Sequence, residues 1–331
     1  MAEPAPQVGE RLPPEAIKAI PVRHPWRWVA AVVVLAITAQ VIGTVVTAPD
    51  LHWEVVGQYV FNQRILQGVL LTLLLTVGAM LMGIILGTIL AVMRLSPNPV
   101  VSTVSWFYIW FFRGTPVLVQ IFFWFNLNTI IHHVGVGIPF TNIGISGDTN
   151  TLISPFLAVL FGLGFNEAAY MAEIVRAGII SVEQGQTEAA QALGMRRLQV
   201  MQRIVLPQAM RVIIPPTGNE TISMLKTTSL AIVVGSVAEL ATVADQISTV
   251  NYRIIELFIV ISLWYLLLTS ILTFGQYYIE RYYARGAQRQ LPPTPLQRFR
   301  RLLFGFHAGM PVEHGRDVVL PVPRNPDGTT L

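Results

Sequence analysis

The sequence predicts an all-α, polytopic membrane protein with about six transmembrane spans. Of the 331 residues, 53% are hydrophobic and 12% are charged, whereas an ordinary soluble domain has roughly 25% charged residues. Apolar runs of about 20 residues recur along the chain, and a helix of that length crosses a hydrocarbon core of roughly 30 Å. The absence of cysteine excludes disulfides, thiolate metal sites and a cysteine nucleophile. These observations exclude a conventional soluble enzyme.

The N-terminal part is predicted to be a flexible tail followed by an additional span. Residues 1–25 are polar and rich in Pro and Ala, a composition that buries too little apolar surface to fold alone. Residues 28–47 are apolar and uncharged, and this run is long for a signal peptide, so we expect an uncleaved span within residues 26–54. A cleaved signal is the alternative, because Val46-Thr-Ala48 resembles a small-residue cleavage site.

Five further spans follow from the apolar runs, at 69–92, 100–127, 152–174, 207–225 and 254–278. We expect an interruption of the third at Arg113-Gly-Thr-Pro116 and an unwinding of the fifth at Pro215-Pro216, because proline removes a backbone donor and glycine relaxes the chain. Residues 226–250 are apolar but contain Lys226, Glu239 and Asp245, and this segment is either re-entrant or a partial helix.

The distribution of basic residues predicts the orientation. Arg and Lys precede the first span, follow the second, fill residues 176–203 and recur in the Pro-rich tail 281–331. The intervening connections, around 50–54 and 132–148, contain none. Because positive charge marks cytoplasmic loops, both termini are expected in the cytoplasm, and the multi-pass chain in the plasma membrane.

The basic segment after the fourth span predicts a helix-turn-helix hairpin on the cytoplasmic face. Ser181 and Gln184 form a capping-box pattern at its start. Gly194 suits the left-handed residue that ends a helix, and Pro207 suits the first turn of the next one. From composition alone, this hairpin is either an amphipathic loop without a partner or a docking surface for another protein.

A resemblance favours docking. Glu188-Ala-Ala, three residues, Gly194, nine residues, Ile204, one residue and Leu206-Pro207 resemble the EAA motif of ABC importer permeases, the loop that docks into the ATP-binding subunit. Over about residues 55–280, Arg113-Gly-Thr-Pro-Val-Leu-Val-Gln120 and Ala169-Tyr-Met-Ala-Glu-Ile-Val-Arg176 resemble the polar amino acid subfamily, the histidine/glutamine permease type. The chain departs from that subfamily at Thr227, where an acidic residue is common, and in its additional first span and long C-terminal tail.

The resemblance implies a type I ABC importer permease fold in which residues 55–280 are the transmembrane domain. It also implies a second permease subunit, either the same chain or a paralogue, together with ATP-binding subunits and an extracytoplasmic solute-binding protein that delivers a polar amino acid. The implied ATPase-coupling loop contains Glu188, Ala189, Ala190, Gly194, Ile204, Leu206 and Pro207. Since the chain has no GxxxxGK[ST] motif, ATP and Mg are expected on the partner, and no enzyme activity, cofactor, metal or nucleic acid is expected here.

Polar residues inside the spans predict a substrate pathway. An unpaired charge facing lipid costs at least ~2.5 kcal/mol, so these residues should face protein or a cavity. A zwitterionic amino acid needs a cation for its carboxylate and a carboxylate for its ammonium group. The candidates are Arg113, Asn166, Glu167, Glu173, Glu220 and Lys226. The alternative is that these charges form structural pairs.

The sequence fits two other classes of membrane protein less well. A membrane-embedded enzyme is disfavoured because the chain has neither an HExxH nor a GxSxG motif. An ion-coupled secondary transporter or a channel needs no cytoplasmic docking loop, and a secondary transporter typically contains an internal repeat, which this sequence lacks.

Overall fold

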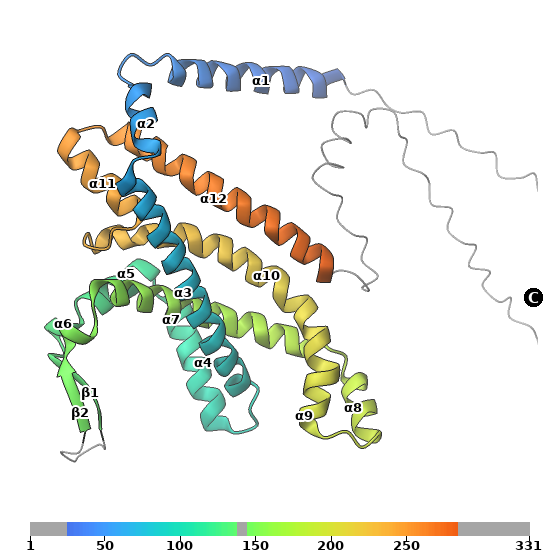
Figure 1. Cartoon of the computed structure of the whole chain (residues 1–331). Coiled ribbons are helices and arrows are strands. Elements are labelled where there is room, and N and C mark those ends of the chain that lie inside the picture. Colours follow the sequence, from blue (N-terminus) through green and yellow to red (C-terminus); the bar gives the residue numbers. More distant parts are fainter. Residues whose placement is uncertain (1–24, 138–143, 284–331) are drawn as a thin grey trace, which may run out of the picture. The chain divides into compact units, whose positions relative to one another are not determined.

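The computed structural model describes residues 25–137 and 144–283, so the two predicted tails lie almost entirely outside the described residues (Figure 1). The predicted first span is a helix, α1 (Pro25–Val46), which belongs to a separate unit of the chain. The second unit comprises residues 46–291 and contains all the other elements.

The second unit is almost entirely helical. Its first half contains α2 (Trp53–Val60), α3 (Gln63–Arg94), α4 (Pro99–Gly114), α5 (Val117–Phe125), η1 (Leu127–Thr129), the antiparallel strands β1 (His133–Gly137) and β2 (Gly144–Asp148), α6 (Thr149–Leu152) and α7 (Pro155–Ile180). Its second half contains α8 (Gln184–Ala192), α9 (Arg197–Val200), the π-helical turn η2 (Met201–Val205), α10 (Leu206–Thr227), η3 (Thr228–Val233), α11 (Leu240–Asn251) and α12 (Ile254–Tyr283).

Among the described residues, α1, α3, α7 and α12 are long and apolar enough to cross a membrane. The other two predicted spans correspond to the broken pair α4 and α5 and to α10. With 12 residues, α11 is about 18 Å long and too short to cross. The segment 226–250 therefore has the length of a partial or re-entrant helix.

The predicted interruption of the third span is confirmed and lies between α4 and α5, at Thr115 and Pro116. The amide of Gln120 donates to the carbonyl oxygens of Phe112 and Thr115, at 3.0 and 3.1 Å. Asn166 of α7 donates to the same Phe112 oxygen. These side chains satisfy backbone oxygens that the broken helix leaves without amide partners.

The predicted unwinding at Pro215-Pro216 is wrong. The helix α10 runs from Leu206 to Thr227 and includes both prolines. Each proline removes one amide from the helical ladder, but the turns on either side continue and α12 packs alongside. Gln276 of α12 donates to the Pro215 carbonyl oxygen at 3.3 Å and to Asn219 at 2.9 Å. Neighbouring polar groups of this kind explain why proline is tolerated inside membrane helices.

The helix α7 is the innermost of the long helices. Its most apolar window is 67% buried, compared with 17% for α12. It packs against α3, where glycines allow close contact: a Cβ atom at Gly87 would lie 2.8 Å from the Ala168 carbonyl oxygen. Small residues at such crossings let helix backbones approach each other. The strands β1 and β2 precede α7 and the hairpin α8–α9 follows it, so about 39 Å of helix separates them (Figure 1).

Candidate functional site

The predicted hairpin is present and projects beyond the end of α10 (Figure 1). Gly194 ends its first arm with φ +78°, as predicted from the sequence. The predicted capping box is wrong, because α8 begins after Glu183 and the Ser181 hydroxyl donates instead to the Gly178 carbonyl oxygen in α7. The cap lies on the second arm, where the Arg196 amide donates to Gln199 at 2.9 Å.

The two arms of the hairpin share a small core. Ala190, Val200 and Val205 are buried there, and Ile204 packs against them. Glu188 and Ala189 are exposed and so are available for a partner, whereas Ala190 supports the fold of the hairpin from inside. Leu206 and Pro207 are also exposed, at the junction with α10.

The structure adds two residues that sequence reasoning missed. Leu193 and Leu198 flank the turn and are 84% and 66% exposed. Exposed leucines at the tip of a projecting hairpin form an apolar surface suited to a protein groove. The sequence signal was their position on either side of Gly194, because a tight turn leaves no room for the flanking side chains to pack inward.

A cavity of about 320 Å³ lies between α7, α10 and the start of α5. The α7 side contributes residues at helical spacings i, i+3, i+4 and i+7, and the α10 side repeats that spacing. A stripe with this spacing occupies one face of a helix, so two such stripes face each other across the cavity. The lining residues are Leu163, Asn166, Glu167 and Tyr170 of α7, Glu220, Ser223, Met224 and Thr227 of α10, and Val117 of α5.

Glu167 is the most confined polar group of this cavity. Its side chain is 3% exposed, and its Oε1 atom has no hydrogen-bond partner. Gly83 of α3 lies directly behind it, since a Cβ atom there would be 2.5 Å from Cγ of Glu167. The neighbouring Asn166 is held by its 2.7 Å hydrogen bond to the Phe112 carbonyl oxygen. Glu167 lies midway along α7, about 18 Å from either end.

Arg113 reaches the edge of this cavity through Tyr170. Its guanidinium carbon lies 5.1 Å from the centroid of the Tyr170 ring, a cation-π distance. Arg113 also attracts the carboxylate of Glu220 electrostatically. The cavity and its edge thus bring together four of the predicted residues, Arg113, Asn166, Glu167 and Glu220.

Glu173 and Lys226 do not line the cavity. Glu173 forms an ion pair with Arg176, one turn along α7, with 2.6 Å between Oε2 and Nη2. Lys226 is exposed, and its neighbour Thr227 lines the cavity instead. Tyr170, Ser223 and Thr227 were missed as lining residues. Their spacing from Glu167 and Glu220 was the signal that could have identified them.

A buried carboxylate outside the cavity ties the second half of the unit together. Glu239 is fully buried and begins α11, where its Oε2 atom accepts from the Ala241 amide at 2.8 Å. Its Oε1 atom accepts from the hydroxyls of Thr72, Thr228 and Tyr265. Hydrogen bonds to the charged form satisfy a buried carboxylate without a cation. Glu239 therefore has a structural role, in linking α3, η3, α11 and α12.

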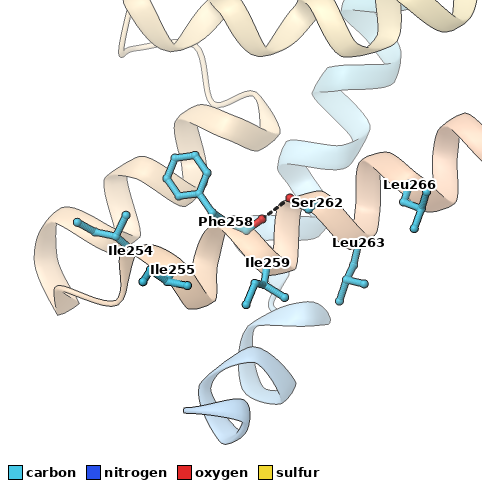
Figure 2. Close-up of a pocket in the computed structure, with 7 residues that line it drawn as sticks. All are labelled: Ile254, Ile255, Phe258, Ile259, Ser262, Leu263 and Leu266. Carbon is cyan, nitrogen blue, oxygen red and sulfur yellow. Dashed lines mark hydrogen bonds between the residues drawn. The ribbon is translucent and has the colours of Figure 1, made fainter. Parts of the chain in front are cut away.

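A further hollow follows the outer face of α12 (Figure 2). Six of its seven lining side chains are apolar, and the one hydroxyl, of Ser262, donates to the Phe258 carbonyl oxygen in its own helix. Ile255 and Leu266 are 67% and 64% exposed. This surface offers an amino acid no polar partner and has the character of a lipid-facing helix. It is not a candidate substrate site.

Comparison with known proteins gives a consistent set of similarities. Residues 83–285 match the family of binding-protein-dependent transport system inner membrane components. The arginine transport system permease protein ArgU of Corynebacterium glutamicum is 46% identical over 283 residues, 86% of this chain and 88% of the relative. The probable amino-acid permease protein YxeN of Bacillus subtilis is 37% identical over 66% of this chain and 90% of its own length.

Solved structures show the same similarity. A crystal structure of an amino acid ABC transporter with histidines aligns with a TM-score of 0.56 at 35% identity, covering 66% of this chain and 94% of that one. An inward-facing MetNI methionine ABC transporter aligns with a TM-score of 0.52 at 19% identity, covering 67% and 97%, which shows likeness of fold alone.

Proposed function

Because the chain belongs to the family of binding-protein-dependent transport system inner membrane components and is a permease subunit of an amino-acid ABC transporter, we propose that its hairpin couples ATP hydrolysis on a partner to substrate movement through the α7–α10 cavity. The predicted type I permease fold is confirmed. The family membership decides against an ion-coupled transporter or a channel.

The observation that carries this proposal is the continuity between the hairpin and the cavity. The second arm, α9, continues through η2 into α10 without a break. Further along the same helix are Glu220, Ser223 and Thr227, which line the cavity. A displacement of the hairpin by a partner is therefore transmitted along one helix to the residues that face the substrate.

The proposed assembly has the division of labour of an ABC importer. An ATP-binding cassette subunit holds ATP and Mg and receives the hairpin, where Glu188, Ala189, Leu193 and Leu198 are exposed. A second permease subunit, either the same chain or a paralogue, completes the translocation unit. An extracytoplasmic solute-binding protein delivers the amino acid at the end of α7 that carries β1 and β2. In this orientation both termini lie in the cytoplasm, and residues 55–280 form the transmembrane domain.

Substitutions at the hairpin tip test the coupling role. Leu193→Asp and Leu198→Asp each place a charge on the apolar tip, so we expect loss of the co-purifying ATPase and of ATP hydrolysis stimulated by the loaded binding protein. The control is Val250→Asp, an 80% exposed residue at the end of α11, which should leave both readouts unchanged. Normal assembly and stimulated hydrolysis in both leucine variants would contradict the proposal.

A further inference from the structure

We propose that a groove between α10 and α12 binds an anionic phospholipid, with one acyl chain in the groove and the phosphate group on Arg211. This inference goes beyond the proposed coupling function, because it assigns a lipid site on the outside of the helix that links the hairpin to the cavity. It follows from the length and chemistry of the groove and from the cation at its mouth.

The groove has the depth of one leaflet of a bilayer. The helices α10 and α12 pack along each other (Figure 1), and a groove of about 450 Å³ lies between them. It extends from Ile214 to Ile222 on α10 and from Ile271 to Ile279 on α12. Each stretch rises by about 12 Å along its helix, close to half of a hydrocarbon core of roughly 30 Å. The groove therefore has a suitable length for one acyl chain.

The groove offers a ligand a largely apolar surface. Thr217 and Thr221 each donate their hydroxyl to the carbonyl oxygen four residues earlier in α10. The amide nitrogen of Gln276 donates to Asn219 at 2.9 Å, and its Oε1 atom is buried. Gly275 leaves free space, since a Cβ atom there would meet no atom within 4 Å. These properties suit a hydrocarbon chain rather than an amino acid.

The groove and the α7–α10 cavity use different faces of α10. Gly218 lines the groove, whereas Glu220 lines the cavity. Because these residues are two positions apart, their directions differ by about 160° around the helix. An occupant of the groove therefore lies behind α10, away from the proposed substrate pathway.

Arg211 lies at one end of the groove. It precedes Ile214 by three residues and Gly218 by seven, spacings that keep it on the groove face of α10. Its side chain is exposed, and none of the ion pairs within residues 25–137 and 144–283 involves it. The guanidinium group is therefore available for a phosphate group, with which arginine can form two parallel hydrogen bonds.

Tyr282 marks the same end of the groove as the membrane interface. Gln276 of α12 donates to the Pro215 carbonyl oxygen of α10. From this contact, Arg211 lies about 6 Å along α10 and Tyr282 about 9 Å along α12, toward the hairpin end of the antiparallel pair (Figure 1). Tyr282 is 67% exposed, and tyrosines of this kind gather at the headgroup level. In the proposed orientation this is the cytoplasmic leaflet, where basic residues between helices bind anionic headgroups.

Native mass spectrometry of the purified complex of permease and ATPase measures the lipid preference. Phosphatidylglycerol and phosphatidylcholine with identical acyl chains are added separately, so that a difference in retention reports the headgroup charge. We expect phosphatidylglycerol to bind at about fivefold lower concentration, the effect of one arginine near a membrane surface. Equal retention of the two lipids would overturn the proposal.

Substitution of Arg211 locates the headgroup. Arg211→Gln should abolish the preference for phosphatidylglycerol, whereas Arg211→Lys, which keeps the charge, should retain most of it. The control Arg64→Gln neutralises an exposed arginine at the start of α3 and should leave the preference intact. An undiminished preference in Arg211→Gln would place the headgroup elsewhere and overturn the assignment.

Filling the groove locates the acyl chain. Gly275→Phe adds a ring where there is free space, so it should lower the retention of phosphatidylglycerol without disturbing the packing of α10 on α12. Leu266→Phe enlarges a 64% exposed residue of the hollow on the outer face of α12 and is the matched control. Equal retention by the two variants would show that the chain does not lie in the groove.

Crosslinking identifies the occupant in a bilayer. A photoreactive benzoylphenylalanine replaces Ile271, which lines the groove and is 59% exposed, in vesicles of phosphatidylglycerol and phosphatidylcholine. Illumination should add the mass of one phospholipid to the permease. The absence of a lipid adduct, or a crosslink to another polypeptide such as a second copy of the chain, would overturn the proposal. Neither result concerns the hairpin, so the coupling proposal would remain.

Discussion

Asn166 of α7 donates a 2.7 Å hydrogen bond to the carbonyl oxygen of Phe112, near the end of α4. Asn166 lines the cavity, and Phe112 lies just before the break at Thr115 and Pro116. One side chain therefore connects the wall of the cavity to the interruption of the third span, so the geometry of the break and the shape of the cavity depend on each other.

Replacement of Asn166 should destabilise the protein. Asn166→Leu removes one donor to the Phe112 carbonyl oxygen, which still accepts from Gln120, so the expected cost is that of one hydrogen bond, about 0.5–1.5 kcal/mol. Thermal unfolding of the purified complex in detergent measures the effect, and Asn150→Leu, at an exposed position, is the matched control. A melting temperature equal to that of the control would show that Gln120 alone holds the break.

The turn of the hairpin requires a left-handed residue. Gly194 has φ +78° and open space around the position of a Cβ atom, so the constraint is the backbone conformation alone. Gly194→Val should greatly reduce stimulated ATP hydrolysis because β-branched residues resist positive φ, whereas Gly194→Asn should retain most of it. Equal hydrolysis in the two variants would show that the turn tolerates another conformation.

The proposed orientation predicts opposite labelling of two exposed positions. In the cysteine-free chain, Asn150→Cys should react with an impermeant thiol reagent added outside intact cells, because it lies just before α7 at the outer end. Arg196→Cys in the hairpin should react only after the membrane is opened. External labelling at position 196 would reverse the topology.

The glycine behind Glu167 should be irreplaceable. Gly83→Ala forces an atom to within 2.5 Å of Cγ of Glu167, whereas Gly78→Ala on the same helix meets only the end of the Leu160 side chain, at 3.0 Å. We expect a lower melting temperature of the purified complex for the first variant and a near-normal one for the second, because a flexible side-chain end can move. Equal melting temperatures for the two variants would show that α3 can move away from α7 at this crossing.

The Glu239 network should be essential for stability. Glu239→Ala removes the carboxylate that accepts from Tyr265, and an unsatisfied buried hydroxyl costs about 1–3 kcal/mol. The hydroxyls of Thr72 and Thr228 can still donate to the carbonyl oxygens of Gly68 and Leu225. We expect a large drop in the melting temperature of the complex and a smaller one for Glu239→Gln, which keeps one acceptor. Glu54→Ala provides the surface comparison. A small effect of Glu239→Ala would indicate that water replaces the carboxylate.

Local signals in the sequence were sufficient for the spans, the break and the turn. Apolar runs identify helices by length, the Arg113-Gly-Thr-Pro116 break follows from backbone chemistry, and Gly194 follows from its allowed φ. The prediction at Pro215-Pro216 was wrong because the effect of a proline depends on its neighbours in space. Gln276, which donates to the Pro215 carbonyl oxygen, lies 61 residues away in the sequence.

The direction in which a charged side chain points was harder to predict. Glu167 and Glu173 are six residues apart on α7, and at about 100° per residue their directions differ by about 120° around the helix. Both are glutamates in the same span, yet one faces the cavity and the other pairs with Arg176. Similarly, one donor to Glu239 is Thr72, which lies 167 residues away in the sequence. No local sequence pattern predicts such a contact.

The π-helical turn η2 has a consequence for insertions and deletions. A single π turn contains one residue more than an α-helical turn in the same place, so the flanking helical segments keep their rotational phase. Deletion of one residue within Met201–Val205 should convert η2 to an ordinary turn and leave both the hairpin and the Glu220 face of α10 in their present directions. The same deletion between Ala209 and Gly218 would turn that face by about 100° relative to the hairpin. An engineered one-residue deletion is therefore expected to be better tolerated in η2 than in the stretch from there to the cavity.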